Sequence, residues 1–315
     1  MSYSVLGQSI YKTLCYFDIA DYPLTKEELY AFLWQPPAIG YGEFLEKIAQ
    51  APVESKMSHY FLPGRSETVE NRRRKFVVSD LKLNIAKKAA KKIRSVPFLK
   101  AIFVCNSVGS EQATEESDID FLIITSPRRI WIARGFANII LRLFGLRTYG
   151  KKIKNKICLS FFVDSDHLNL CSLKAAEDDV HFVYWFQRML PIYDPENLYS
   201  KFLSENDWAK KFTPNMRTNV IGAGERQVEN SKLGAIWKKI WETMWRGAYG
   251  DLIENQAKQT QWMKIKLAMK EKAEMKDNGV VFADGVIKLH ENDTRLNYRD
   301  KWEKRCDELM YAKIN

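Results

Sequence analysis

The amino-acid sequence predicts an α+β protein with an α/β core, an N-terminal module and a mostly helical C-terminal region. Three apolar runs have the length of a buried strand, and polar turns and an amphipathic helix separate them: 99–105, 120–125 and 157–163. The second observation is Asp284-Gly285 between two β-type runs near 279–290, which predicts a late β-hairpin. The third is helical periodicity on both sides of the strand-rich part.

Composition sets the limits for the class of protein. The chain has 315 residues, 46% of them hydrophobic, so it can bury a sizeable core. Its formal net charge of +10 favours acidic partners such as nucleotides, nucleic acid or an anionic membrane surface. The five cysteines form no CxxC pair, and the histidines lack metal-ligand spacing. We therefore expect a reduced, cytoplasmic protein without a zinc site.

Membrane insertion and secretion are not expected. The N-terminus has no basic segment followed by an apolar run, as a signal peptide would. The most apolar helical stretch, 130–144, is interrupted by Arg134 and Arg142. It is too short and too charged to be a transmembrane segment.

Residues 1–65 predict a winged-helix-like module. Apolar side chains at helical spacing predict a first helix over 4–18. Thr25 followed by Glu28 predicts a capping box at the start of a second helix. A third helix is expected over 42–49, followed by a hairpin. The third helix would be the recognition helix, and its two glutamates disfavour specific DNA binding.

Residues 66–96 predict a basic connector helix, which Pro97 ends. Its apolar positions are helically spaced, and cations cluster at 72–75. Such a run is either a solvated helix face or a surface that contacts a polyanionic substrate.

Residues 173–315 predict a helical C-terminal region. Its helices are expected over 176–189, 233–272 and 296–312, with the hairpin before the last one. Trp237, Trp241 and Trp245 recur every four residues and form an apolar stripe. The stripe predicts a helix that packs against the catalytic domain. Interfacial membrane contact and a partner groove are the alternatives.

The pattern that indicates chemistry lies in the expected core, residues 97–172. Asp118 and Asp120 stand two positions apart at the start of an apolar strand, so their side chains point to the same face. Adjacent like charges repel unless a cation neutralises them, and Mg²⁺ prefers one or two carboxylates with phosphate oxygens and water. We therefore expect Asp118 and Asp120 to be catalytic and to bind Mg²⁺ or Mn²⁺.

A polar turn directly follows the first strand of the core. It contains Asn106, Ser107, Gly109 and Ser110. A turn of this kind can present backbone N–H groups to phosphate oxygens. Together with carboxylates on the next strand it forms the minimum apparatus for nucleotidyl transfer. We therefore expect these four residues to bind a nucleoside triphosphate.

Segment 101–125 resembles the DNA polymerase β-type nucleotidyltransferase superfamily. The signature of that family is a hydrophobic strand, Gly-Ser, a spacer, and then Ser-Asp, an apolar residue and Asp. Ser117-Asp118-Ile119-Asp120 matches its second half. The spacing places the serine of the signature at Ser107 and its glycine at Asn106, because Gly109-Ser110 leaves too short a spacer. The resemblance implies magnesium-dependent transfer of a nucleoside monophosphate to a hydroxyl of a protein, an RNA end or a small molecule.

Two departures from the family pattern leave the activity open. Asn106 replaces glycine, although asparagine tolerates left-handed backbone angles. The family usually has a third carboxylate on the next long strand, whereas Ser160 occupies the expected inward position here. Asp164 or Asp166 could substitute only if the backbone turns back. The alternatives are a weak or inactive nucleotide-binding regulator with a DNA- or protein-binding winged helix, and a toxin of a toxin–antitoxin pair.

Overall fold

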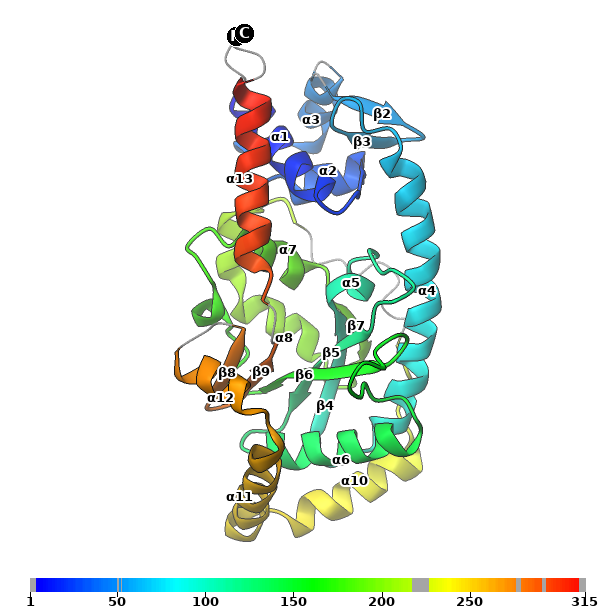
Figure 1. Ribbon diagram of the computed structural model, residues 1–315, viewed down its shortest axis with the longest axis vertical. Helices are drawn as coiled ribbons and strands as arrows, with labels where there is room; N and C mark the ends of the chain where they lie inside the picture. Colours follow the sequence, from blue (N-terminus) through cyan, green and yellow to red (C-terminus); the bar gives the residue numbers. More distant parts are fainter. Residues whose placement is uncertain are drawn as a thin grey trace.

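The chain folds into a mixed α+β structure, as predicted (Figure 1). This computed structural model describes residues 4–49, 51, 53–216, 227–275, 279–290 and 293–311. A six-stranded sheet has the strand order β7-β4-β5-β6-β9-β8, and a three-stranded sheet has the order β1-β3-β2.

The elements have the following bounds. The strands are β1 Leu24–Thr25, β2 Glu54–Lys56, β3 His59–Phe61, β4 Leu99–Cys105, β5 Ile119–Thr125, β6 Ile157–Asp164, β7 Leu190–Tyr193, β8 Val280–Ala283 and β9 Val286–Leu289. The α-helices are α1 Val5–Asp18, α2 Lys26–Phe32, α3 Tyr41–Ile48, α4 Thr68–Ile93, α5 Asn106–Gly109, α6 Ile130–Leu143, α7 Val180–Gln187, α8 Leu198–Glu205, α10 Lys232–Met244, α11 Gly247–Lys264, α12 Leu267–Glu274 and α13 Arg295–Tyr311. Short 3₁₀ helices cover Cys171–Leu173 and Asp207–Lys211.

The N-terminal module consists of α1, α2, α3 and the three-stranded sheet. The predicted capping box is confirmed: Thr25 Oγ1 accepts the Glu28 N–H at 3.2 Å, and Glu28 Oε2 accepts the Thr25 N–H at 2.9 Å. Met57 and Ser58 join β2 to β3 with φ of 49° and 61°. Two consecutive positive φ angles match the right-handed twist of a hairpin, so this turn closes without glycine.

The predicted basic helix is α4, which runs along one side of the molecule (Figure 1). This helix links the N-terminal module to the sheet and also packs against the sheet. Leu83, Ala86, Ala90 and Ile93 are buried in the same apolar cluster as strands of the large sheet. One face of α4 is therefore part of the core. Its exposed cations are Arg73, Arg74, Lys88, Lys91 and Lys92.

The large sheet separates two apolar cores. On β4, Ile102 and Val104 belong to the core that α4 and α6 cover. Phe103, between them in sequence, belongs to the core shared with α7, α8 and the N-terminal module. Successive side chains of β4 thus point into opposite cores, as they do in a strand that is buried on both faces. The three strands predicted for the central region are confirmed as β4, β5 and β6.

The region after residue 173 differs from expectation, because it also supplies β7, β8 and β9 to the large sheet. The predicted hairpin is confirmed, with Gly285 at φ 70° in its turn, and β9 pairs antiparallel with β6. A hairpin distant in sequence thus extends the core sheet. The last helix, α13, returns to α1 (Figure 1), where Trp302 Nε1 donates to Lys12 O at 2.8 Å.

The prediction of a single helix over 233–272 is wrong. Three helices occupy it, α10, α11 and α12. The first break falls at Trp245 and at Arg246, whose backbone is extended, and Gly247 then opens α11 with a left-handed φ of 60°. The second falls at Ile265 and Lys266, whose backbone is extended. Among the described residues no helix is both long and apolar enough to cross a bilayer.

The apolar stripe on α10 does not pack against the core as expected. No residue of α10 is buried. The helix instead contacts the rest of the protein through polar groups: Lys238 Nζ bonds Leu99 O, and Glu242 Oε1 accepts the Phe98 N–H at 2.6 Å. Because those contacts fix the rotation of the helix, most of the stripe faces outward.

Candidate functional site

Strand register brings the predicted acidic residues and the polar turn to one edge of the sheet. Cys105, the last residue of β4, pairs with Asp120 on antiparallel β5. Asp120 pairs in turn with Cys158 on β6, which runs parallel to β5. Asn106 directly follows Cys105, so the end of β4 and the starts of β5 and β6 form one cluster.

Asp118 and Asp120 lie close together, as their spacing predicts. Their carboxylate oxygens and the Cys158 sulfur are all within 4.8 Å of one another. Asp120 is only 8% exposed. Burial, with a further contribution from the charge of Asp118, raises the pKa of Asp120 to about 7. Burial likewise raises the pKa of Asp118. A buried carboxylate and a half-buried one at this separation are unfavourable as two negative charges, and either a cation or a proton relieves the repulsion.

Charge compensation of this pair within the protein comes from longer range, where the charges of Arg147 and Lys82 lower the pKa of Asp118. Across the part of the chain that the structure describes, the one ionisable base within 4.0 Å of either carboxylate is His290, whose Nε2 is 4.0 Å from Asp120 Oδ1. Burial lowers the pKa of His290 to about 4, so its imidazole is neutral near pH 7. Neutral imidazole does not offset the negative charge of the pair.

The donor atoms fit a hard divalent cation held by the two carboxylates. Mg²⁺ and Mn²⁺ prefer oxygen ligands and take one or two carboxylates together with phosphate oxygens. Cys158 offers a thiol whose pKa burial raises to about 12. A neutral thiol is a poor ligand for a hard cation. Cys158 is therefore a neighbour of the carboxylate pair, and Asp118 and Asp120 are the residues that would bind the ion.

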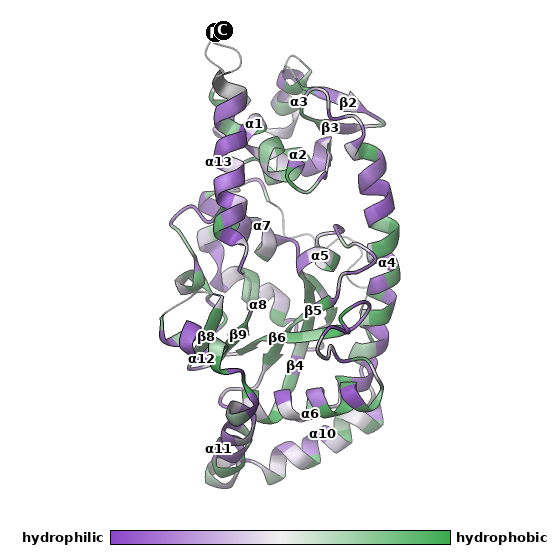
Figure 2. Ribbon diagram, in the orientation of Figure 1, coloured by the Kyte–Doolittle hydropathy of each residue, from purple (hydrophilic) through white to green (hydrophobic). Residues whose placement is uncertain are grey.

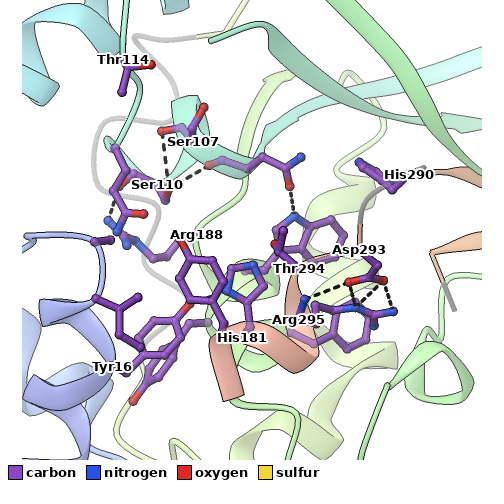
Figure 3. A pocket seen from close by; sticks show the side chains of 18 of the residues that line it. Tyr16, Ser107, Ser110, Thr114, His181, Arg188, His290, Asp293, Thr294 and Arg295 are labelled. Atoms are coloured by element: carbon purple, nitrogen blue, oxygen red, sulfur yellow. Dashed lines mark hydrogen bonds and ion pairs between the residues drawn. The ribbon is translucent and has the colours of Figure 1, made fainter. Parts of the chain in front are cut away.

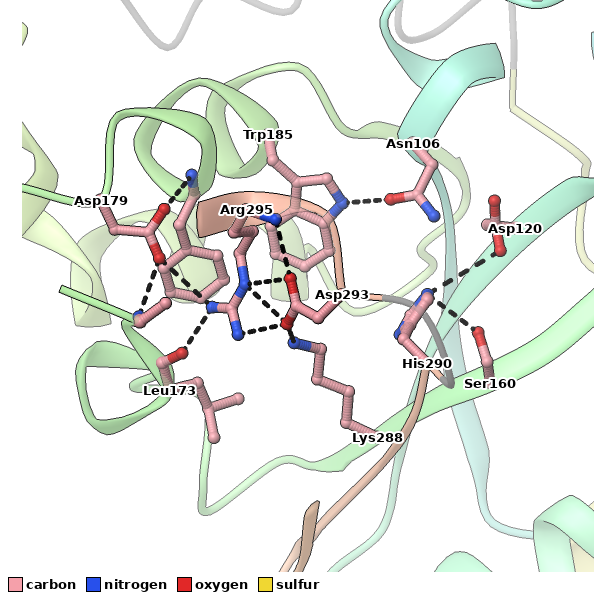
Figure 4. Close-up of polar contacts among 12 residues, drawn as sticks. Asn106, Asp120, Ser160, Leu173, Asp179, Trp185, Lys288, His290, Asp293 and Arg295 are labelled. Atoms are coloured by element: carbon pink, nitrogen blue, oxygen red, sulfur yellow. Dashed lines mark hydrogen bonds and ion pairs between the residues drawn. The ribbon is translucent and has the colours of Figure 1, made fainter. Parts of the chain in front are cut away.

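Asn106 adopts the left-handed conformation that its position in the turn requires, with φ of 53°. Its Oδ1 accepts a hydrogen bond from Trp185 Nε1 at 2.6 Å (Figure 4). Its side-chain amide also acts on Asp120, where it lowers the pKa of the carboxyl against the larger effect of burial. The asparagine at position 106, where the family signature has glycine, thus has two consequences. Asparagine keeps the turn geometry, and its amide links the turn to the acidic pair.

The other predicted turn residues divide into two groups. Ser107 and Ser110 line a cavity beside the turn (Figure 3). Ser110 Oγ donates to Asn106 O at 2.8 Å, so this hydroxyl also stabilises the turn. Gly109 is buried and does not line that cavity. Its role is steric.

Gly109 permits a close approach of backbone segments, which gives a test. A Cβ at this position would lie 2.7 Å from Val104 O and 3.0 Å from Arg188 O, both backbone atoms. We expect Gly109→Ala to destabilise the fold by about 3 kcal/mol, because one carbonyl belongs to β4 and the other to the end of α7, and neither can move alone. Urea denaturation measures this. Gly42→Ala is the control, since a Cβ there meets nothing within 4 Å; equal stability of the two variants would refute the steric role.

The candidates for a third carboxylate do not reach the site. Asp164 pairs with Thr125 at the opposite end of β5, five residues from Asp120 or roughly 16 Å along the strand. It instead accepts hydrogen bonds from the backbone N–H of Asp166 and from the ring of His167. Asp166 follows it, farther from the pair. The hypothesis that either residue completes the site is wrong, because β6 continues straight past the acidic pair.

Ser160 lies buried beside the site, and a residue outside the predicted core joins it there. Ser160 Oγ and His290 Nε2 are 3.2 Å apart (Figure 4). The register of β5 and β6 shifts between Asp120 and Leu122, so β6 carries one extra residue there. Bulges of this kind redirect side chains next to functional sites. His290, which follows β9, therefore occupies the neighbourhood in which a third acid was expected.

Sequence reasoning missed His290 and Cys158. Cys158 is predictable only from the register of β6, because the cysteine has no local motif. His290 depends on the pairing of β9 with β6. Beside it, Asp293 forms ion pairs with Lys288 at 3.1 Å and with Arg295 at 2.5 Å (Figure 4). These contacts hold the segment that carries His290.

A cavity of about 490 Å³ lies beside the polar turn, and neither Asp118 nor Asp120 is among the residues that line it (Figure 3). Asn106 and His290, which both approach Asp120, line it. Its far side is aromatic: the rings of His181 and Tyr298 are 4.4 Å apart, and Tyr16 Oη lies 3.0 Å from His181 Nδ1. The cavity is large enough for a nucleotide-sized molecule. Its walls come from the N-terminal module, the core and the C-terminal segment.

Lys82 of α4 holds the loop that carries Asp118. Its side chain is almost fully buried, at 2% exposure. Its Nζ donates to Glu115 O at 3.0 Å, Ser117 O at 2.8 Å and Asn155 Oδ1 at 2.7 Å. All three ammonium hydrogens are thus used on the segments that lead into β5 and β6. The basic helix therefore positions the site.

Comparison with known proteins does not identify the chain. No protein-family model, curated protein or solved structure matches it.

Proposed function

We propose that the chain is a divalent-cation-dependent nucleotidyltransferase that resembles the DNA polymerase β-type superfamily. The observation that supports this proposal best is the pair of half-buried Asp118 and buried Asp120, at the start of one strand and beside the polar turn that follows its neighbour. Such a pair is costly unless a cation or a proton binds, and hard cations on two carboxylates are typical of sites for triphosphates.

In this proposal Asp118 and Asp120 would hold Mg²⁺ or Mn²⁺, which neutralises charge on the triphosphate when bound. The Asn106-Ser107 turn contacts the phosphates, and the cavity lined by Ser107, Ser110 and His181 receives the rest of the nucleotide. An acceptor hydroxyl attacks the α-phosphorus. The new P–O bond forms as the bond to the β-phosphate breaks, and pyrophosphate leaves.

The hydroxyl proton needs an acceptor in the absence of a third carboxylate. His290 is the candidate, because its neutral imidazole lies 4.0 Å from Asp120 and 3.2 Å from Ser160. A neutral histidine can accept a proton as a general base, with a typical contribution of about a hundredfold to the rate. The base strength of a buried imidazole is low, so we expect slow turnover.

The N-terminal module supports a second role beside catalysis. Its elements follow one another as α1, β1, α2, α3 and the hairpin of β2 and β3, and β3 also pairs with β1. This order resembles that of a winged helix. Residues Tyr16 and Ile19, in and just after α1, line the cavity, so the module would contact the bound nucleotide or its acceptor. A nucleotide-binding regulator is the corresponding alternative if turnover is absent.

The test uses the full chain with each of the four ribonucleoside triphosphates, labelled on the α-phosphate, and Mg²⁺. Acceptors are the protein itself and an RNA oligonucleotide with a free terminal hydroxyl. We expect label transfer with release of pyrophosphate, and its loss when a chelator removes the metal. Saturable, metal-dependent binding without transfer would support the regulator. Neither binding nor transfer with any triphosphate would refute both.

A further inference from the structure

The helix α10 exposes its apolar face. Five large apolar side chains lie on that face at helical spacing, each more than half exposed: Leu233 81%, Ile236 59%, Trp237 52%, Ile240 51% and Met244 56%. Residues at these intervals form one continuous stripe. An amphipathic helix of a water-soluble domain normally turns such a stripe toward the core. Here these five side chains stay more than half exposed, and none of the residues of α10 is buried.

The attachment of α10 fixes this orientation. Lys238 and Glu242 lie one turn apart and bond to Leu99 O and to the Phe98 N–H. Gly234 packs against Ser95, so closely that a Cβ would collide with the Ser95 hydroxyl. The polar side of the helix is therefore docked, and the outward stripe follows from that docking.

Neighbouring elements extend the apolar surface. Helix α6 lies beside α10 at the lower end of the molecule in Figure 1, and the rings of Phe136 and Trp245 are 5.6 Å apart. On α6, Phe136, Ile139 and Leu143 are exposed at helical spacing. Figure 2 shows apolar residues alternating with polar ones along α6. The exposed apolar area thus involves two adjacent helices.

The charged residues of α10, together with Arg246 just after its C-terminal end, indicate what kind of surface the apolar face would bind. The exposed charged side chains of this segment are Lys232, Lys239 and Arg246, all positive. Its one acidic residue, Glu242, is engaged by the Phe98 N–H. The whole chain carries a net charge of +10. An apolar stripe that contains tryptophan and is flanked by cations complements an anionic lipid surface, where rings sit at the headgroup level and cations meet phosphates.

We propose that α10 binds the interface of an anionic lipid bilayer, with Leu233, Trp237 and Ile240 among the acyl chains and Lys239 and Arg246 at the headgroups. The contact is peripheral, since no described helix is suited to cross a bilayer. This inference is independent of the proposed nucleotidyl transfer, because the acidic pair and the cavity share no residue with α10.

Vesicle sedimentation tests the proposal with the full chain. The vesicles are phosphatidylcholine alone, or phosphatidylcholine with about a third phosphatidylglycerol. We expect binding to the anionic vesicles at least about tenfold tighter than to the neutral ones, together with a blue shift of tryptophan fluorescence. A wild-type chain that binds neither vesicle, or both equally, would overturn the proposal.

Matched variants localise the surface. The double variant Ile236→Lys, Ile240→Lys puts cations into the stripe and should weaken partitioning by at least about tenfold, despite its higher charge. Leu81→Lys, on the exposed face of α4, is the control and should bind like the wild type. Circular dichroism verifies that both variants fold. If the double variant binds anionic vesicles as tightly as the wild type, the proposal is wrong. If the wild type has no affinity for vesicles but forms a dimer that the double variant does not form, the exposed face of α10 binds a second copy of the chain instead.

Discussion

Asp120→Asn is expected to reduce nucleotidyl transfer by at least about a thousandfold, which corresponds to roughly 4 kcal/mol of transition-state stabilisation. Asparagine preserves the shape of the side chain but removes half of the charge that would hold the cation. Asp120 is buried and lies within 4.8 Å of Asp118, so the charge is lost directly at the atoms that would hold the cation. Single-turnover transfer from α-labelled triphosphate is the measurement.

The same substitution should have the opposite effect on stability without metal. Two carboxylates in a buried site repel each other, and each lacks the hydration that it has in the unfolded chain. Removing one charge should therefore raise the melting temperature by several degrees in the presence of a chelator. Adding Mg²⁺ should stabilise the wild type and leave Asp120→Asn unchanged.

The control for both effects is Asp166→Asn, at the opposite end of β6, where the side chain is exposed. This variant should keep the activity and the metal-dependent melting temperature of the wild type. If Asp120→Asn transfers label as fast as Asp166→Asn, the carboxylate pair is not the metal site.

The second large effect is expected for Lys82→Met. Methionine fills a similar volume but leaves Glu115 O, Ser117 O and Asn155 Oδ1 without their donor. Unpaired buried acceptors cost about 1–3 kcal/mol each, and relaxation recovers part of that, so we expect a loss of about 3 kcal/mol. Urea denaturation measures it.

The loss of these bonds should also slow transfer by about tenfold to a hundredfold below the melting transition, because the loop before Asp118 is no longer fixed. Lys88→Met, exposed on the same helix, is the control for the charge and should change neither quantity by much. If Lys82→Met loses stability but keeps full activity, the lysine supports only the fold.

Local sequence features predicted the elements around the site. The capping box of Thr25 and Glu28, the runs that became β4, β5 and β6, and the turn at Asp284-Gly285 follow from neighbouring residues. The proximity of Asp118 and Asp120 follows from their spacing alone. Such features are decided over a few residues, so one sequence is sufficient to predict them.

Features that depend on distant pairing were not predictable. His290 reaches Asp120 because β9 joins the edge of β6, and no residue near His290 encodes that register. Lys82 is buried because three acceptors from two loops converge on it, whereas a lysine in a basic run is normally solvated. The outward stripe of α10 depends on two polar contacts that override its periodicity.

The most direct test of the metal site is a crystal structure of the chain with Mn²⁺ and a non-hydrolysable triphosphate, using the anomalous scattering of manganese. We expect a manganese peak about 2.2 Å from one carboxylate oxygen of Asp118 and from one of Asp120. We expect the phosphates to lie against the Asn106-Ser107 turn. Manganese elsewhere, or a triphosphate bound away from both aspartates, would contradict the proposed metal site.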